Sequence, residues 1–221
     1  MPSALVVGAT RGLGAALVKQ YASQSATAEV YGTTRSGSAP QGFPDSVKWL
    51  SNIDLTNPDV GDSITQQLKG AQPLDVVVIS AGSFVLEDFS AEKGPNWAEE
   101  VKMYTTSSVA PVFIVHRLAH AGLLRPGSKV VLVSSEAGSI ALRHEKEGGG
   151  LYGHHASKAA LNMAGKLLAL DLKERGVVVS IVHPGFMRTE LTKSVGFDQH
   201  WDEGGGACKS QFWLMIHLSH G

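Results

Sequence analysis

The sequence predicts an α/β fold, with a single domain built on a doubly wound parallel sheet. Three observations lead to this prediction. Short runs of β-branched residues alternate with longer helical segments along the chain, which is the order of a βαβ architecture. A glycine-rich turn joins the first of these runs to the first helical segment. The length of 221 residues, 43% of them hydrophobic, suits one domain with a sizeable core.

Six segments are predicted as strands. Several are continuous apolar runs rather than alternating patterns, which is typical of strands that helices cover on both faces. The clearest are Val-Val-Val-Ile at 76–79 and Val-Val-Leu-Val at 130–133. The six predicted strands are residues 5–7, 29–33, 47–50, 75–80, 129–134 and 177–182.

Four helices are predicted between these strands. They cover residues 12–23, 58–69, 96–121 and 155–175. The last is apolar around more of its surface than a one-faced helix requires. Burial at a subunit contact and dense packing in the core both explain this composition.

Composition and charge exclude several classes of function. A net charge of −1 gives no electrostatic case for a partner that is a nucleic acid or an anionic membrane. No apolar run is long enough to span a bilayer, and the amino terminus does not resemble a signal peptide, so we expect a cytoplasmic protein. His116 and His120 have the spacing of helical metal ligands, but no third ligand accompanies them, and no metal site is predicted.

The glycine-rich turn comprises Gly8, Gly12 and Gly14, with Thr10, Arg11 and Leu13 between them. Glycine lets the backbone turn tightly and approach a ligand closely, and the helix that follows offers unpaired amides to a phosphate. A tight turn without a ligand is the alternative interpretation. The order of strand, glycine turn and helix favours a nucleotide-binding turn in a Rossmann-like fold.

The charges near this turn predict which nicotinamide cofactor binds. Arg35 follows the second predicted strand, where the adenosine ribose lies in such folds, and Arg11 lies within the turn itself. Two guanidinium groups suit a 2′-phosphate, whereas an NAD site places an acidic residue here. Solvated arginines are the alternative, but the pattern favours NADP(H) over NAD(H).

Further motifs resemble those of the short-chain dehydrogenase/reductase family, in the family's order. Asn52–Thr56 resembles the acidic loop after the third strand, Ser80-Ala81-Gly82 the turn after the fourth, and Ser134–Ser139 the serine-bearing end of the fifth. The resemblance implies that the cofactor lies against Asp54, Leu55, Ser80, Ala81, Gly82, Lys158, Pro184, Gly185 and Thr189. It also implies a carbonyl-reductase-like activity and a homodimer or homotetramer, formed through the helices at 96–121 and 155–175.

The catalytic positions implied by the resemblance are only partly filled. Ser135 and Lys158 match the family's serine and lysine, but His154 stands four residues before Lys158, where the family has tyrosine. Tyr152 lies two residues earlier, outside the i,i+4 relation. Ser107 falls where many members have a helical asparagine.

Three interpretations of His154 follow. It is the proton donor, although Lys158 one turn away lowers its pKa; or Tyr152 swings in as the donor; or acid catalysis is lost. The predicted function is NADP(H)-dependent reduction of a carbonyl, or oxidation of an alcohol, on a small to medium apolar substrate. Activity is expected to be impaired or altered. The alternative is a catalytically silent relative that binds NADP(H) as a sensor or a structural partner in an oligomer.

The carboxyl-terminal part is predicted to depart from the family. Residues 1–206 form the predicted cofactor-binding domain, with a substrate lid at about 186–203. Residues 207–221 form an atypical tail, whose apolar segment either pairs as an edge strand, docks on a partner or stays exposed.

Overall fold

The computed structural model describes residues 3–24, 29–145 and 148–185, together with Met187, Thr189 and Lys193. As predicted, strands alternate with helices along the chain, except that the second and third strands follow one another directly. The strands are β1 (Ser3–Val7), β2 (Glu29–Thr33), β3 (Val47–Leu50), β4 (Leu74–Ile79), β5 (Leu124–Val133) and β6 (Val178–Val182). The helices are α1 (Gly12–Ser23), α2 (Val60–Gln67), α3 (Trp97–Tyr104), α4 (Ala110–His120) and α5 (Tyr152–Asp171).

All six strands are parallel and pair in the order β3-β2-β1-β4-β5-β6. The chain therefore starts in the middle of the sheet, builds outward to β3, and returns beside β1 to build the other half. The reversal between β1 and β4 is the place where ligands bind in doubly wound sheets. The predicted fold class, a single α/β domain with a Rossmann-like sheet, is confirmed.

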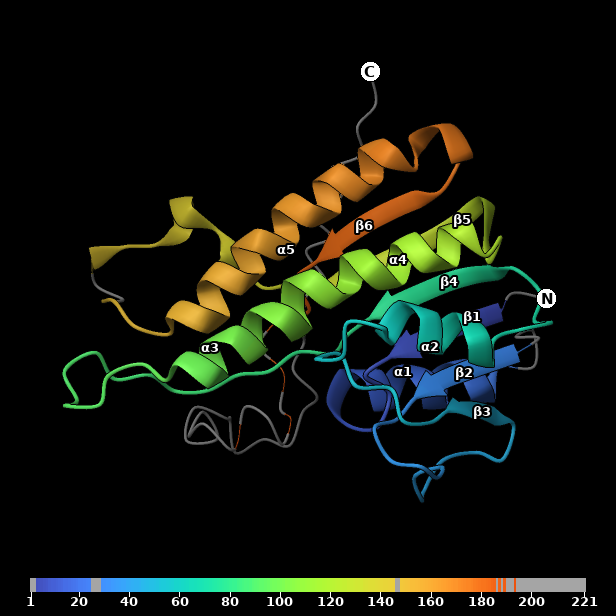
Figure 1. The fold of residues 1–221 in the computed structure, drawn as a ribbon, viewed down its shortest axis with the longest axis horizontal. Coiled ribbons are helices and arrows are strands. Elements are labelled where there is room, and N and C mark those ends of the chain that lie inside the picture. Colours follow the sequence, from blue (N-terminus) through green and yellow to red (C-terminus); the bar gives the residue numbers. More distant parts are fainter. Residues whose placement is uncertain are drawn as a thin grey trace.

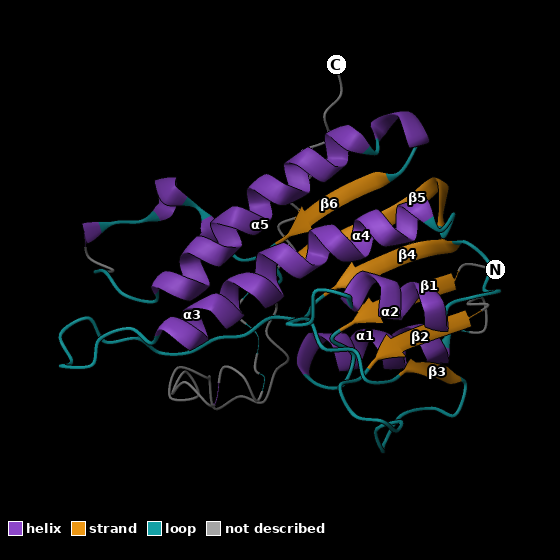
Figure 2. Cartoon of the chain, viewed as in Figure 1, coloured by secondary structure: helices purple, strands orange, loops and turns teal. Residues whose placement is uncertain are grey.

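Helices cover both faces of the sheet, with α2, α4 and α5 on one face and α1 on the other (Figures 1 and 2). Successive side chains of a strand point to opposite faces, so each strand contributes to two cores. Leu5 and Val77 belong to the larger core under α2, α4 and α5. Val6 and Val78 pack with Val18 of α1 in the smaller one. Burial on both faces explains the continuous apolar runs.

The helix predicted at 96–121 is interrupted in its middle. Asn96 caps α3, because its side-chain oxygen accepts hydrogen bonds from two backbone amides. A π-helical turn, Thr105–Val109, then separates α3 from α4. Pro111 accounts for the interruption, since it has no amide hydrogen to give to the carbonyl of Ser107 and its ring would clash with that carbonyl in a regular α-helix.

Several other predicted boundaries also move, and two of the shifts have a visible cause. β5 starts at Leu124 rather than at residue 129. Pro126 and Gly127 interrupt the regular strand but do not end it, because the amide of Gly127 donates a hydrogen bond to the carbonyl oxygen of Gly176 at 2.8 Å. α5 starts at Tyr152 rather than at residue 155. The side chain of Glu87 accepts the amide hydrogen of Gly153 at 3.0 Å, which stabilises the additional residues of the first turn.

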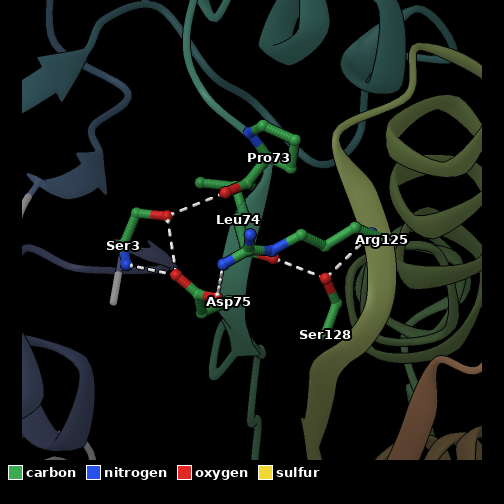
Figure 3. Close-up of polar contacts among 6 residues, drawn as sticks. All are labelled: Ser3, Pro73, Leu74, Asp75, Arg125 and Ser128. Carbon is green, nitrogen blue, oxygen red and sulfur yellow. Dashed lines mark hydrogen bonds and ion pairs between the residues drawn. The ribbon is translucent and has the colours of Figure 1, made fainter. Parts of the chain in front are cut away.

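A polar cluster joins the amino ends of β1, β4 and β5 (Figure 3). Asp75 accepts a hydrogen bond from the amide of Ser3 at 2.8 Å and pairs with the guanidinium of Arg125. Ser128 donates to the carbonyl oxygen of Leu74 at 2.6 Å. These bonds satisfy polar groups at the amino edge of the sheet, the edge opposite to the one where ligands are expected.

Among the helices of the described residues, none is long and apolar enough to cross a membrane. Of the predicted lid, Met187, Thr189 and Lys193 are described. The rest of the lid, from residue 186 onward, and the tail at 207–221 lie outside the described residues.

Candidate active site

A cavity of about 620 Å³ lies at the carboxyl ends of the strands. Its lining brings together residues from every part of the chain that the sequence motifs single out. With the exception of Tyr152, each predicted site residue contributes to it: Gly8, Thr10, Arg11, Gly12, Leu13, Gly14, Arg35, Asp54, Leu55, Ser80, Ala81, Gly82, Ser135, His154, Lys158, Pro184, Gly185 and Thr189.

The glycine turn leaves no room for side chains at two positions. A Cβ atom on Gly8, which has a φ of +87°, would lie 2.7 Å from the amide nitrogen of Ala81. A Cβ on Gly14 would lie 2.1 Å from the carbonyl oxygen of Gly8. Glycine at these positions therefore lets the turn pack against the end of β4.

The amino end of α1 is open to an anion. The helix begins at Gly12, and Arg11 at the capping position makes no side-chain hydrogen bond to it. The first turn contains no acidic residue. Among the described residues, no side chain caps its free amides, and these amides together with the positive end of the helix dipole form the arrangement that binds phosphate groups.

Positive charge gathers at the same end of the cavity. Arg11 and Arg35 are both exposed, and Lys102 of α3 joins them in the lining. Asp54 lies nearby, and hydrogen bonds from Thr56 hold the pKa of its carboxyl below its ordinary value, with smaller contributions from the charges of Arg35 and Lys102. The backbone amide of Thr56 donates to Asp54 at 2.8 Å.

Ser80 links the glycine turn to β4. Its hydroxyl donates to the carbonyl oxygen of Val7 at 3.1 Å, and the amide of Ala81 donates to the same oxygen at 3.1 Å. A serine in this place therefore fixes the ends of two neighbouring strands to one another. The resulting wall of the cavity is mostly backbone.

Ser135 follows β5 and caps a short 3₁₀ turn, Glu136–Gly138. Its hydroxyl oxygen accepts a hydrogen bond from the amide of Ala137 at 3.1 Å. Within the described part of the chain, its hydroxyl hydrogen has no acceptor, so it is available to a ligand in the cavity. Ser134 is different, since its hydroxyl donates to the side chain of Asn162 at 2.6 Å.

Lys158 reaches the cavity from α5. It is 8% exposed, and its ammonium group donates to the carbonyl oxygen of Val133 at 2.7 Å. Burial lowers the pKa of Lys158 to about 8, because the charged form loses its hydration. At neutral pH the group is therefore a buried cation within the lining.

His154 lies one turn before Lys158 on α5 and contacts the ring of Phe84, with the ring centroids 4.6 Å apart. Burial is the main reason that the pKa of His154 falls to about 4, and the charges of Lys158 and His155 contribute less. The sequence alone attributes the lowered pKa of His154 to the charge of Lys158, whereas in the structure burial contributes most to it. The imidazole is neutral at pH 7.

Tyr152 does not reach this cavity. It is the first residue of α5, its side chain is 43% exposed, and its ring centroid lies 6.0 Å from that of Phe89. α5 is helical from this residue onward, so the rearrangement that would bring Tyr152 beside Lys158 is absent.

Several lining residues were not among the predicted site residues, although Ser134 lies inside the serine-bearing motif. His183 and Ser134 lie at the carboxyl ends of β6 and β5, so the topological rule alone would have indicated them. Phe84, Lys102 and Thr106 also line the cavity, but they come from a loop and from helices whose placement depends on tertiary packing.

His116 and His120 lie outside this lining, with ring centroids 4.3 Å apart. No group of three metal-ligating side chains occurs among the described residues.

Comparison with known proteins gives consistent matches. A family model described as short chain dehydrogenase matches residues 2–200. The 3-oxoacyl-[acyl-carrier-protein] reductase of Escherichia coli is 26% identical over 202 residues, covering 89% of this chain and 78% of that protein. The carbonyl reductase Sniffer of D. melanogaster is 26% identical with a TM-score of 0.71, covering 86% of this chain and 83% of that one. A Burkholderia multivorans structure with bound NADP is 27% identical with a TM-score of 0.69, covering 86% and 81%.

Proposed function

Because this chain belongs to the short-chain dehydrogenase/reductase family, we propose that it is an NADP(H)-dependent oxidoreductase. It reduces a carbonyl group, or oxidises the corresponding alcohol, of a small to medium apolar substrate. The observation that carries the proposal is the convergence of the glycine turn, the two arginines, Ser135 and Lys158 on one cavity. The relatives named above as reductases support it.

The cavity has the donor set that a dinucleotide phosphate needs. The uncapped amides at the start of α1 suit the pyrophosphate, and among the described residues the side chain nearest to a Cβ at Gly12 would be that of Thr189, at 3.5 Å. Arg11 and Arg35, which both line the cavity, would pair with the 2′-phosphate. The NADP in the Burkholderia multivorans structure supports this choice of cofactor.

The other residues that line the cavity indicate the remaining contacts with the cofactor. Asp54 and Leu55 would contact the adenine, Ser80, Ala81 and Gly82 would form the wall beside the riboses, and Lys158 would hold the nicotinamide ribose. Pro184, Gly185 and Thr189 would cover the nicotinamide.

NADPH, when bound, supplies the hydride for the reduction. The free hydroxyl hydrogen of Ser135 would bond to the carbonyl oxygen of the substrate and polarise it. His154 would be the second group at this oxygen, since it lines the same cavity one helical turn from Lys158. The catalytically silent alternative is not favoured, because Ser135 and Lys158 are both in place to act.

We also propose a cytoplasmic homodimer or homotetramer. Large apolar side chains are exposed on α3, α4 and α5, which is the kind of surface that a second copy covers. They are Val101, Tyr104, Phe113, Met163, Leu167 and Leu170.

The test is a calorimetric titration of the purified protein with NADPH and, separately, with NADH. Tight binding of NADPH with much weaker binding of NADH is expected. Absence of binding to either would contradict the proposed activity, and tight binding of NADH alone would contradict the role of the two arginines.

A further inference from the structure

The two ring nitrogens of His154 have different surroundings. Nδ1 is buried and has no hydrogen-bond partner among the described residues, although His154 lines the cavity. Because Nδ1 is buried while the side chain lines the cavity, Nε2 is the ring nitrogen through which His154 can contact a ligand there.

This asymmetry determines where the ring proton lies. A buried N–H without an acceptor is rarer and more costly than a buried acceptor without a donor. An imidazolium, which carries hydrogen on both nitrogens, would leave the Nδ1 hydrogen without an acceptor. The favourable state is the neutral ring with its hydrogen on Nε2, and the lowered pKa of His154 agrees with it.

Two hydrogen-bond donors then belong to the lining of the same cavity. One is the hydroxyl of Ser135, whose oxygen already accepts from the amide of Ala137. The other is the Nε2–H of His154, whose ring packs against Phe84. A neutral imidazole can polarise a carbonyl group, but it is a poor source of a proton.

We propose that His154 acts as a neutral Nε2–H donor, which forms with Ser135 a two-donor site for a carbonyl oxygen, and that the substrates are electron-poor carbonyl compounds. This inference rests on the proposed oxidoreductase function. The reason for the substrate class is that the oxygen is stabilised as an oxyanion rather than protonated during the reaction. Electron-withdrawing groups make that oxyanion less basic, so such substrates need an acid least.

The carbonyl carbon gains a hydride and forms a C–H bond, and the electron pair of the C=O π bond moves to oxygen. The resulting oxyanion accepts hydrogen bonds from Ser135 and His154. Water then gives the oxygen a proton and leaves as hydroxide, which the buffer neutralises.

The first experiment measures the tautomer directly, without cofactor and without turnover. In protein labelled with ¹⁵N-histidine, long-range ¹H–¹⁵N correlations assign the ring nitrogens of His154 between pH 5 and pH 8, with His154→Gln used to identify its signals. We expect a neutral ring with hydrogen on Nε2 throughout this range. A ring that becomes protonated within the range, or one that carries hydrogen on Nδ1, would overturn the proposal.

The second experiment compares His154→Tyr with the wild-type chain, using acetophenones that carry nitro or methoxy groups at the para position. These substrates have nearly the same shape and differ in electron demand. Since a phenol acid is worth ~10²–10⁴-fold, we expect the nitro-to-methoxy ratio of kcat/KM to fall about tenfold or more in His154→Tyr. His155→Tyr, on the next residue and outside the cavity lining, is the matched control and should keep the wild-type ratio.

Equal ratios in the wild-type chain and in His154→Tyr would overturn the proposal while leaving the oxidoreductase function intact. Failure to bind NADPH, measured by calorimetry, would instead contradict the proposed function. If NADPH binds but none of the acetophenones is turned over, the electron-poor substrate class is contradicted, and the NMR result decides on the tautomer of His154.

Discussion

The ammonium group of Lys158 donates a hydrogen bond to the carbonyl oxygen of Val133 at 2.7 Å, which joins α5 to the carboxyl end of β5. The bond places a charged group in the lining of the cavity. Burial lowers its pKa from 10.5 to about 8. The position of Lys158 is therefore fixed by backbone geometry before any ligand binds.

Lys158→Met is expected to change the alkaline part of the stability profile. Between pH 8 and pH 10.5 the unfolded chain keeps a proton that the folded chain has lost. The free energy of unfolding of the wild-type chain therefore rises with pH across this window. Urea unfolding at a series of pH values measures this rise in the free energy of unfolding. A slope that is equally steep in Lys158→Met would contradict the assignment to Lys158.

Glu100 and His154 are expected to act in opposite directions at acidic pH. A hydrogen bond with Glu87, burial and the charge of Glu87 raise the pKa of Glu100 from 4.5 to about 7, so its contribution to stability is lost as pH rises through that window. The pKa of His154 is lowered from 6.5 to about 4, so stability is lost as pH falls from 6.5.

The two slopes partly cancel in the wild-type chain. Glu100→Gln should show stability that rises from pH 4.5 to pH 6.5, and His154→Phe should show stability that falls over the same range. Thermal unfolding of both variants, measured at half-unit steps of pH, separates the contributions of Glu100 and His154. Identical profiles in both variants would show that these groups do not set the pH dependence.

Gly14→Ala is expected to destabilise the glycine turn and to weaken NADPH binding. Its Cβ would meet the carbonyl oxygen of Gly8 at 2.1 Å, so the backbone must move, at a cost of about 1–3 kcal/mol. Gly37→Ala is the control, since its Cβ would meet only Asn52, at an ordinary 3.6 Å. Chemical unfolding and calorimetry measure the two effects; a tolerated Gly14→Ala would contradict the close packing.

Arg35→Ala is expected to lower the affinity for NADPH by about 10–100-fold while changing that for NADH by less than about threefold, because a charged hydrogen bond to the 2′-phosphate is lost. Arg175→Ala, on a 3₁₀ turn after α5 and outside the cavity lining, is the matched control. An equal loss of affinity for both cofactors would place Arg35 away from the 2′-phosphate.

Asp75→Asn is expected to cost about 1 kcal/mol at pH 7, because the cluster in Figure 3 loses its charge-assisted bonds. Bonds from Arg125 and from the amide of Ser3 lower the pKa of Asp75 below 3.8, so its contribution is present above that pH and is lost as pH falls further. Asp62→Asn breaks the pair with Arg117, in which both side chains are about half exposed, and should cost below about 0.5 kcal/mol. Equal losses in the free energy of unfolding for Asp75→Asn and Asp62→Asn would contradict the larger contribution assigned to Asp75.

The fold was predictable because its signals are local. Apolar runs mark strands buried on both faces, and the glycine turn marks the passage from β1 to α1. Most of the cavity lining was predictable for a related reason, since the motifs lie at the carboxyl ends of strands and the topology brings those ends together.

The rest depends on contacts between distant segments. The burial that governs the pKa of His154 is provided in part by Phe84, from the loop after β4. The start of α5 depends on the side chain of Glu87. Lys102 reaches the cavity from α3, which ends at the π-helical turn. Such contacts between distant segments leave no periodic pattern in the sequence from which they could be predicted.

The place of His154 on α5, one turn before Lys158 and in the lining of the cavity, also has a genetic consequence. Histidine and tyrosine codons differ only in their first base. A single nucleotide substitution would put a phenol where the family normally has one, with no insertion, deletion or change of helix register. The histidine therefore stands one nucleotide substitution away from a tyrosine at this position, and a population carrying this gene can sample both versions of the site.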